Sequence, residues 1–294
     1  MDSCKCVVVI PVYRDIPKPS EAASFMQCLH VLANYDIYVL TYEELDLSCY
    51  CQMSEICNKQ FQIKYFARDY FGSVQAYNRL MLERALYQSF IPYKYMLIYQ
   101  LDAWVFRDEL EMWCDRGYDY VGAPVFGIMG KDDYGNVIYT RKMTGIGNGG
   151  FSLRRIQYCL QMLNRFGWVP LMKPAHIWKH ACEKRSVYGG GKILIINILK
   201  IISEFILKLC GFRNSLKYYA TSFNLNEDMF FSLYANDVWL HPNVNLPLPD
   251  EAILFSFEVN PSFLYAKVQR LPFGCHAFEK FEFDSFWSQY ISLL

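Results

Sequence analysis

Tyr95-Met-Leu-Ile-Tyr-Gln-Leu-Asp-Ala-Trp-Val-Phe106 opens with an apolar and aromatic run, which indicates a strand buried on both faces. A single carboxylate, Asp102, follows where that strand should end. Ligands of open α/β sheets bind beyond the carboxyl ends of the strands, so the sequence predicts a ligand site at Asp102. Taken alone, Asp102 also fits the N-cap of a helix that begins near Trp104, and that alternative stays open here.

Strands and helices alternate along the chain before this segment. Residues 7–10, stopped by Pro11, are expected to form a first strand, and residues 21–32 carry apolar side chains at helical spacing. This β-α-β order predicts parallel strands joined by right-handed crossovers. Further strands are expected at 37–40 and 62–66, and a second helix at 73–90.

The segments after Asp102 continue the pattern less regularly. Residues 127–142 are polar and carry glycines, which indicates a mobile loop or a hairpin. The whole chain, 1–294, is predicted to be one α/β domain with a mostly parallel central sheet flanked by helices, and residues 170–220 are predicted to be a helical insertion in it. The other expected elements are helices at 108–114, 151–163, 226–231 and 281–294 and strands at 118–124 and 252–258.

The composition excludes several classes of protein. Of the 294 residues, 53% are hydrophobic and 17% aromatic, which is enough apolar material for a large core and argues against disorder. The 29 basic and 29 acidic residues balance, which argues against a nucleic-acid binder held by overall charge. No apolar run is long enough to span a bilayer, and residues 1–13 lack the core of a signal peptide.

The 11 cysteines are scattered and show no repeated CxxC pattern. Reduced thiols in a cytoplasmic protein are the simplest explanation. The closest group is Cys49, Cys51 and Cys57, and a metal site there is the less favoured alternative.

The predicted insertion contains a basic cluster followed by a very apolar helix. Residues 192–208 are expected to be helical, with a narrow polar stripe among Ile, Leu and Phe. One interpretation is an ordinary helix packed in the core. The other is peripheral contact with the inner face of the cell membrane through residues 173–217, with lysines near the lipid headgroups. The basic cluster comprises Lys173, Lys179, Lys184, Arg185 and Lys192. The polar stripe comprises Asn197, Lys200, Glu204 and Lys208.

Four separated loops carry polar residues beside expected strand ends or helix starts. They hold Asp102, residues 148–150, Glu227 with Asp228, and His276. Each has an ordinary structural explanation: a tight glycine turn, favourable contact of carboxylates with a helix dipole, or a histidine in the core. Their joint occurrence in this order indicates a binding or catalytic site.

Seven blocks of sequence carry a resemblance to a known family. They are Val9-Ile-Pro-Val-Tyr13, Tyr77-Asn-Arg-Leu80, Tyr99-Gln-Leu-Asp-Ala-Trp-Val-Phe106, Trp113 with Asp119-Tyr-Val-Gly-Ala-Pro124, Asn148-Gly-Gly-Phe-Ser-Leu-Arg154, Asn226-Glu-Asp-Met-Phe-Phe231 and Leu271-Pro-Phe-Gly-Cys-His276. Together they resemble glycosyltransferases of the GT-A fold, and more narrowly a group of bacterial family-2-like transferases of the DUF5672 type. The resemblance implies a GT-A-like, Rossmann-like sheet and leaves residues 170–220 uncovered.

The resemblance implies a divalent-metal site. In such enzymes a D-x-D motif follows the central strand and binds the cation through its last carboxylate. Here the motif is Gln100-Leu101-Asp102, so Asp102 is the implied ligand of Mn²⁺ or Mg²⁺, with His276 as a later ligand. Gln100 replaces the first carboxylate, which puts the affinity for metal in question.

A catalytic base and a donor pocket are implied as well. Asp228 is the implied base for the acceptor hydroxyl, and Glu227 is implied to orient the acceptor or the helix. In the donor pocket, residues 11–13 would line the nucleotide base, residues 78 and 79 would approach the ribose and phosphates, and the backbone amides of 148–150 would approach the donor sugar or the acceptor. The implied donor-binding residues are Pro11, Val12, Tyr13, Asn78, Arg79, Gln100, Leu101, Asp102, Asn148, Gly149 and Gly150.

The function implied by the resemblance is transfer of a sugar from a nucleotide-sugar donor to a glycan or lipid-linked acceptor, with inversion, in bacterial surface polysaccharide synthesis. A metal would stabilise the charge that develops on the departing nucleotide. A nucleotidyltransferase that makes nucleotide sugars is an alternative, although no glycine-rich basic signature follows the first strand. A non-catalytic sugar-nucleotide-binding protein is another, because Gln100 replaces a carboxylate.

Overall fold

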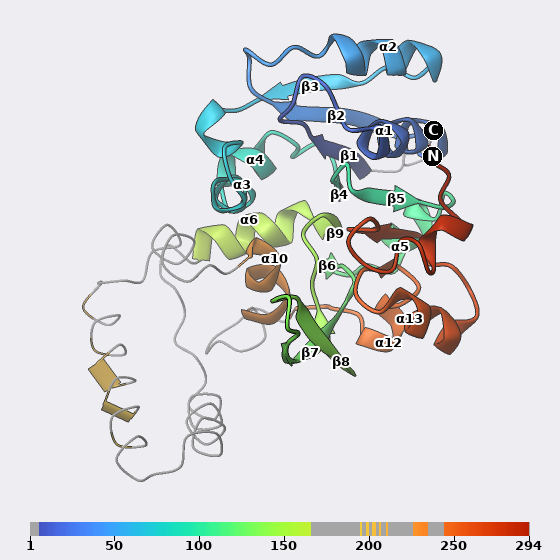
Figure 1. The fold of residues 1–294 in the computed structure, drawn as a ribbon. Helices are drawn as coiled ribbons and strands as arrows, with labels where there is room; N and C mark the ends of the chain where they lie inside the picture. Colours follow the sequence, from blue (N-terminus) through green and yellow to red (C-terminus); the bar gives the residue numbers. More distant parts are fainter. Residues whose placement is uncertain are drawn as a thin grey trace.

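A six-stranded sheet in the order β3-β2-β1-β4-β9-β6 forms the centre of the protein (Figure 1). The computed structural model describes residues 6–165, 226–234 and 244–293, with isolated positions between 195 and 210. Four neighbouring strands are parallel, β9 is antiparallel to β4, and β6 is antiparallel to β9. The predicted α/β fold with a mixed, mostly parallel sheet is therefore confirmed. The strands are β1 (Cys6–Pro11), β2 (Asp36–Thr41), β3 (Gln62–Tyr65), β4 (Tyr95–Tyr99), β6 (Tyr120–Val121) and β9 (Phe151–Arg155).

The central strands are buried on both faces, as their apolar runs predicted. In β1, Val8 and Ile10 contact one hydrophobic core, whereas Val7 and Val9 contact the other. Every residue of β4 is buried, and its side chains divide between the same two cores. Alternate side chains of a strand point to opposite faces, so an unbroken apolar run is what a sheet covered on both sides requires.

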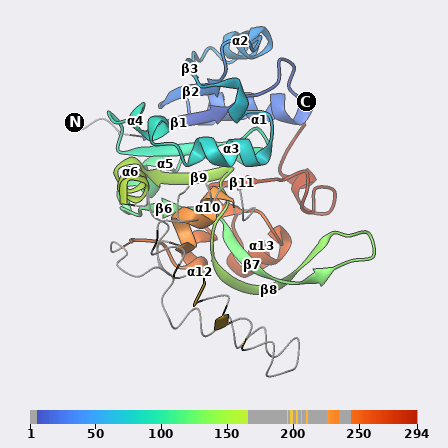
Figure 2. The ribbon, with the colours of Figure 1, turned by 90° about the vertical axis from the view of Figure 1, so that its left-hand side faces the viewer.

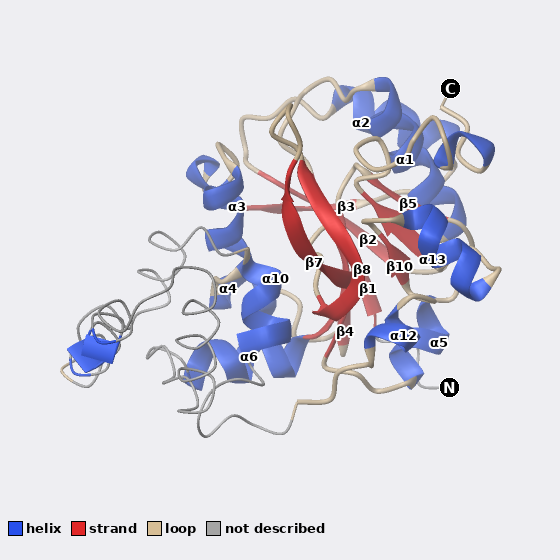
Figure 3. Cartoon of the chain, turned by 60° about the horizontal axis from the view of Figure 1, so that its bottom comes forward, coloured by secondary structure: helices blue, strands red, loops and turns tan. Residues whose placement is uncertain are grey.

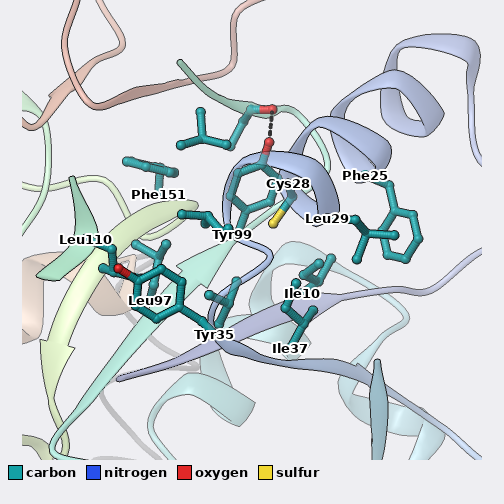
Figure 4. Packing of buried hydrophobic residues seen from close by; sticks show 14 of the residues in the cluster. Ile10, Phe25, Cys28, Leu29, Tyr35, Ile37, Leu97, Tyr99, Leu110 and Phe151 are labelled. Carbon is teal, nitrogen blue, oxygen red and sulfur yellow. Dashed lines mark hydrogen bonds between the residues drawn. The ribbon is translucent and has the colours of Figure 1, made fainter. Parts of the chain in front are cut away.

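Helices cover both faces of this sheet. The Tyr99 ring of β4 packs against Phe151 of β9, with 5.9 Å between the ring centroids (Figure 4). Its hydroxyl lies 3.1 Å from Ser24 Oγ, which links the sheet to the helices on the first face. The first face carries α1 (Pro19–Val31), α2 (Ser48–Ile56) and α5 (Leu110–Asp115), and the second carries α3 (Val74–Met81), α4 (Arg84–Gln88), α6 (Ile156–Arg165) and the π-helical turn η2 (Phe230–Tyr234).

Two smaller sheets complete the described fold. A three-stranded sheet has the order β10-β11-β5, with β11 parallel to β10 and antiparallel to β5. A separate hairpin of β7 and β8 extends beside it (Figures 2 and 3). The remaining elements are β5 (Ala103–Val105), β7 (Pro124–Lys131), β8 (Val137–Ile146), β10 (Ser256–Phe257), β11 (Gly274–His276), α10 (Glu227–Met229), α12 (Pro249–Ala252), α13 (Pro261–Val268), η1 (Arg68–Tyr70) and η3 (Trp287–Gln289).

The prediction of one helix over 151–163 is wrong. Phe151–Arg155 is the strand β9, and α6 begins at Ile156. Asn148 has φ of +76°, in the left-handed region that asparagine tolerates, and the chain then runs back along β4. The turn before this segment therefore decides its structure.

Three other elements differ from expectation. The helix predicted at 73–90 is divided into α3 and α4, and the Tyr87 hydroxyl donates to the Met81 carbonyl oxygen at 2.9 Å, at the end of α3. The strand predicted at 252–258 is reduced to β10 because residues 249–252 form α12, and the helix predicted at 281–294 is reduced to η3. Residues 127–142 lie in the β7–β8 hairpin, which confirms one of the two alternatives given for them.

Most of the predicted insertion, 170–220, and the polar stripe of the 192–208 helix lie outside the described residues. Four described apolar side chains in this segment are between 48% and 61% exposed: Ile195, Leu199, Ile202 and Ile206. Within the part of the chain that the structure describes, no helix is both long enough and apolar enough to cross a membrane.

Candidate active site

The turn between β4 and β5 holds Asp102 at the carboxyl end of the central strand. The Ala103 N–H donates to the Gln100 carbonyl oxygen at 2.9 Å, and the Gln100 N–H donates to the Gly150 carbonyl oxygen at 2.8 Å. The Asp102 side chain is 45% exposed. Because the next element is the strand β5, the alternative in which Asp102 caps a helix is wrong.

Strand register brings His276 beside this turn. β11 runs antiparallel to β5 with His276 opposite Ala103. The His276 Nε2 atom lies 3.1 Å from Asp102 Oδ1 and 3.2 Å from Gln100 Oε1. Three residues named from the sequence are therefore brought together at one point.

Glu258 joins this group and was missed by sequence reasoning. It follows β10, whose parallel register with β11 sets Phe257 opposite Cys275. Glu258 consequently lies alongside His276, with its Oε1 atom 3.1 Å from Nδ1. The available signal was the one that identified Asp102, a carboxylate at the end of a predicted strand.

These contacts shift the pKa values of the group. Burial alone would lower the pKa of His276, but the carboxylates of Asp102 and Glu258 outweigh it and raise the pKa to about 10. Burial would raise the pKa of Asp102, but the charge and hydrogen bond of His276, helped by Lys18, lower it. In the absence of metal, His276 is therefore an imidazolium between two carboxylates at neutral pH.

The atoms around His276 Nε2 fit a divalent cation. Adjacent ligands of an octahedral cation with bonds of about 2.1 Å are roughly 3 Å apart, which matches the distances from Nε2 to Asp102 Oδ1 and Gln100 Oε1. Carboxylate and amide oxygens suit Mg²⁺ and Mn²⁺, and the imidazole favours Mn²⁺. No cluster of three or more Asp, Glu, His and Cys side chains that could hold a metal occurs among the described residues. The Gln100 amide oxygen, 3.2 Å from Nε2, would be a third ligand beside Asp102 and His276.

Asp228 lies across the 147–150 loop from this group, at the start of α10. Its Oδ2 atom accepts the Asn148 N–H at 2.7 Å, whereas its Oδ1 atom makes no hydrogen bond within the described residues. Burial, followed by the negative charge of Glu227, raises the pKa of Asp228 to about 7 although the Asn148 N–H opposes the shift. A carboxyl with a free oxygen and a pKa near neutrality is suited to accept a proton from a substrate.

Glu227 is held in a buried ion pair. Its Oε1 atom lies 2.9 Å from an Arg154 guanidinium nitrogen, and the two side chains are 2% and 0% exposed. Arg154 also donates to the Tyr87 hydroxyl at 3.0 Å and the Gly149 carbonyl oxygen at 3.2 Å. This network ties α10 to β9, so of the two roles implied for Glu227 it favours orientation of the helix.

The glycines of the 147–150 loop allow both groups to approach it. A Cβ atom on Gly150 would overlap His276 Nε2 and Gln100 Oε1, and a Cβ atom on Gly149 would overlap Glu227 Oε1. The loop therefore lies between the His276 group and the α10 carboxylates. A side chain at Gly150 would displace His276, and one at Gly149 would displace Glu227.

The amides expected to meet a ligand are partly used within the protein. The Asn148 N–H donates to Asp228, and the Gly150 N–H donates to Asn148 Oδ1 at 2.9 Å. Buried polar atoms are normally hydrogen-bonded, yet three in this region make no hydrogen bond within the described residues. They are Asn148 Nδ2, Glu227 Oε2 and Asp228 Oδ1, and their concentration indicates that a ligand or water meets them here.

The remaining donor-binding candidates divide into exposed and buried residues. Pro11, Val12 and Leu101 are buried in the core, so they position the site through packing. Tyr13 is 49% exposed. Partial burial raises the pKa of its hydroxyl, although the charge of Arg14 opposes the shift. Tyr13 follows β1 and Asp102 follows β4, and because these strands are parallel neighbours both residues lie at the same edge of the sheet.

Asn78 and Arg79 lie on α3, on the side of α10. Asn78 is buried and its Nδ2 atom lies 3.5 Å from Asn226 Oδ1, immediately before Glu227. Arg79 follows Asn78 on the same helix, and within the described residues no hydrogen bond or ion pair joins Arg79 to Asp102 or Asp228. Asn78 is thus next to the residues that begin α10.

Comparison with known proteins identifies one family and several distant structures. A family model described as "Protein of unknown function (DUF5672)" matches residues 60–276. No curated protein sequence matches the chain. Core-mannan synthase A from Aspergillus fumigatus, in a Mn/GDP form, is similar with a TM-score of 0.36 and 9% identity over 54% of this chain. This chain spans 63% of that protein, which is less than two thirds of its length.

Two further solved structures show similarly low TM-scores and sequence identities. A 4-diphosphocytidyl-2C-methyl-D-erythritol synthase has a TM-score of 0.35 and 12% identity, covering 55% of this chain and 79% of that one. A197 from STIV has a TM-score of 0.28 and 12% identity, covering 53% of this chain and 66% of that one. At these identities the likeness concerns the α/β fold alone, and the functional argument has to come from the side chains of the site.

Proposed function

The chain belongs to the DUF5672 family, and on that premise we propose that it is an inverting glycosyltransferase that uses a nucleotide-sugar donor. One observation carries the proposal. The loop that contains Gly149 and Gly150 separates the paired side chains of Asp102 and His276 from a buried carboxyl, Asp228, that has a free oxygen and a pKa of about 7. Sugar transfer from a diphosphate needs these two functions on opposite sides of the reacting carbon.

Binding of the nucleotide-sugar donor is supported by the oxygen atoms of Asp102 and Gln100 that lie near His276 Nε2. Asp102, Gln100 and His276 would hold Mn²⁺ or Mg²⁺ and, with it, the diphosphate of the donor. When bound, the cation would stabilise negative charge that develops on the leaving nucleotide. Tyr13, which is half-exposed at the same edge of the sheet, would contact the nucleotide base.

The acceptor side is supported by the environment of Asp228. The proton of the acceptor hydroxyl would pass to Asp228 Oδ1 while Oδ2 stays hydrogen-bonded to the Asn148 N–H. A base of pKa about 7 is about half ionised at neutral pH and is strong enough to accept a proton as the bond forms. Glu227, through its ion pair with Arg154, would hold α10 in place and so keep Asp228 next to the 147–150 loop.

We place the acceptor among glycans or lipid-linked carriers, with docking on the inner face of the cell membrane through residues 173–217. The exposed apolar positions Ile195, Leu199, Ile202 and Ile206 support this, because a stripe at helical spacing would lie on a lipid surface beside the lysines of the same segment.

The test is a panel of nucleotide sugars, each incubated with Mn²⁺ or Mg²⁺, in which release of nucleoside diphosphate is measured. Slow donor hydrolysis by the wild type, lost in Asp228→Asn, would support the proposal. Release of pyrophosphate from a sugar phosphate and a nucleoside triphosphate would instead identify a nucleotidyltransferase. Nucleotide binding without turnover on any donor would identify a non-catalytic binding protein.

A further inference from the structure

Glu258 is a carboxylate at the candidate site to which the proposed reaction gives no role. It does not lie on the side of His276 that faces Asp102 and Gln100. Its Oε1 atom is 3.1 Å from Nδ1, whereas Asp102 Oδ1 and Gln100 Oε1 lie 3.1 and 3.2 Å from Nε2. Each ring nitrogen of His276 therefore has its own oxygen partners.

We propose that Glu258 is a positioning residue that makes His276 a metal ligand, by accepting the Nδ1–H hydrogen bond and leaving Nε2 to bind the cation. A neutral imidazole carries one proton, and the hydrogen bond made by one nitrogen decides which nitrogen keeps it. A carboxylate at Nδ1 holds the proton there and makes Nε2 more basic. The inference rests on the proposed function in one respect, that a cation binds at Nε2.

The surrounding backbone holds the ring in this orientation. β10 and β11 are parallel neighbours, so Glu258 and His276 are carried side by side by two hydrogen-bonded strands. On the other side, Gly150 packs so closely against Nε2 that an added Cβ atom would overlap it. The ring is thus confined between a strand end and a glycine loop, and its rotation would break both sets of contacts.

The experiment measures Mn²⁺ binding to the full-length protein by electron paramagnetic resonance of free Mn²⁺, without donor or acceptor. Glu258→Gln keeps the size and an acceptor oxygen but removes the charge, and we expect it to weaken Mn²⁺ binding about tenfold or more. Glu258→Ala should weaken it further. Glu279→Gln is the matched control, because Glu279 is an exposed carboxylate three residues from His276 and its loss changes the net charge equally.

A second measurement reads the ring of the wild type itself, and a variant serves only to assign the signal. With diamagnetic Cd²⁺ bound to the wild type, long-range ¹H–¹⁵N spectra should show the His276 ring protonated at Nδ1, with the signal assigned by its loss in His276→Gln. A ring protonated at Nε2 would overturn the inference. So would a wild type that does not bind Mn²⁺, a Glu258→Gln variant with unchanged affinity, or an equal loss in Glu279→Gln.

These readouts separate the inference from the proposed function. If Mn²⁺ binds and Glu258→Gln weakens that binding, but no nucleotide sugar is turned over, the transferase proposal fails and the role of Glu258 stands. If the protein transfers sugar with no loss of Mn²⁺ affinity in Glu258→Gln, the role of Glu258 fails and the transferase proposal stands.

Discussion

Replacing Asp228 by Asn should make the protein more stable while removing its activity. In the wild type the Asn148 N–H donates to Asp228 Oδ2 at 2.7 Å. The variant keeps the shape of the side chain and an oxygen that can accept this hydrogen bond. What it removes is a carboxyl whose ionised form is unfavourable in its buried position. The test of the base assignment is therefore also a test of the electrostatics of the site.

The size of the effect follows from the pKa of Asp228, which burial and Glu227 raise from 3.8 to about 7. A shift of about three units corresponds to about 4 kcal/mol between the two protonation states. Because the folded-state pKa is above the unfolded one, the protonated carboxyl stabilises the fold at low pH, and that contribution is lost as the pH rises through about 7. Between pH 5 and pH 8 the loss is about 2.5 kcal/mol.

The assay is urea or thermal unfolding of wild type and Asp228→Asn at several pH values from 5 to 8. The stability advantage of the variant should grow over this range by about 2.5 kcal/mol, or roughly 5 °C in melting temperature, and level off above pH 7. Asp133→Asn is the control, because Asp133 is an exposed aspartate in the β7–β8 hairpin. An advantage that does not change with pH would refute the raised pKa and, with it, the electrostatic argument for Asp228 as the base.

The kinetic part of the same prediction concerns rate and donor affinity. Turnover by the wild type should rise with pH and reach a plateau above about 7, as Asp228 loses its proton. In Asp228→Asn the rate should fall roughly a hundredfold or more with little change in donor affinity. If donor affinity collapses instead, Asp228 belongs to the donor site and the base is a different residue.

Three further predictions follow from the same structure. Asp102→Ala should remain folded by circular dichroism but lose nearly all donor turnover, and turnover equal to that of the wild type would contradict its assignment. Arg154→Met should lower the free energy of unfolding by about 3–5 kcal/mol because it leaves Glu227 buried without its partner, and a smaller loss in the double variant with Glu227→Gln would show that the unpaired charge is the cause. The wild type should float with anionic vesicles at low salt, and protein that stays unbound would assign residues 192–208 to a core. Flotation should be lost when four lysines are changed to Glu: Lys173, Lys179, Lys184 and Lys192.

Much of the fold is determined by local patterns in the sequence. The unbroken apolar runs of β1 and β4 indicated strands covered on both faces, and the helical spacing of residues 21–32 indicated α1. Asp102 was recognisable because it is a carboxylate at the end of such a strand, where ligands of open α/β sheets bind. These features depend on side-chain periodicity, which is the same in the unfolded and the folded chain.

The tertiary structure decided the features that depend on strand pairing. Phe151–Arg155 has apolar residues that fit a helix or a strand, and it became β9 because the turn at Asn148 returns it along β4. Glu258 contacts His276 because β10 pairs with β11 in a register that sets the two side chains next to each other. Pairing and register arise from contacts between distant segments, so no local pattern contains them.

The chemistry of the site divides in the same way. The sequence identified Asp102, Asp228 and His276 as residue types that could serve a metal-dependent transfer. Their protonation comes from burial and neighbours, since the pKa of Asp228 is raised by desolvation and that of His276 by two carboxylates. A sequence names the ionisable groups, but only packing sets the water and charge around each one, and that environment determines which of them holds a proton at neutral pH.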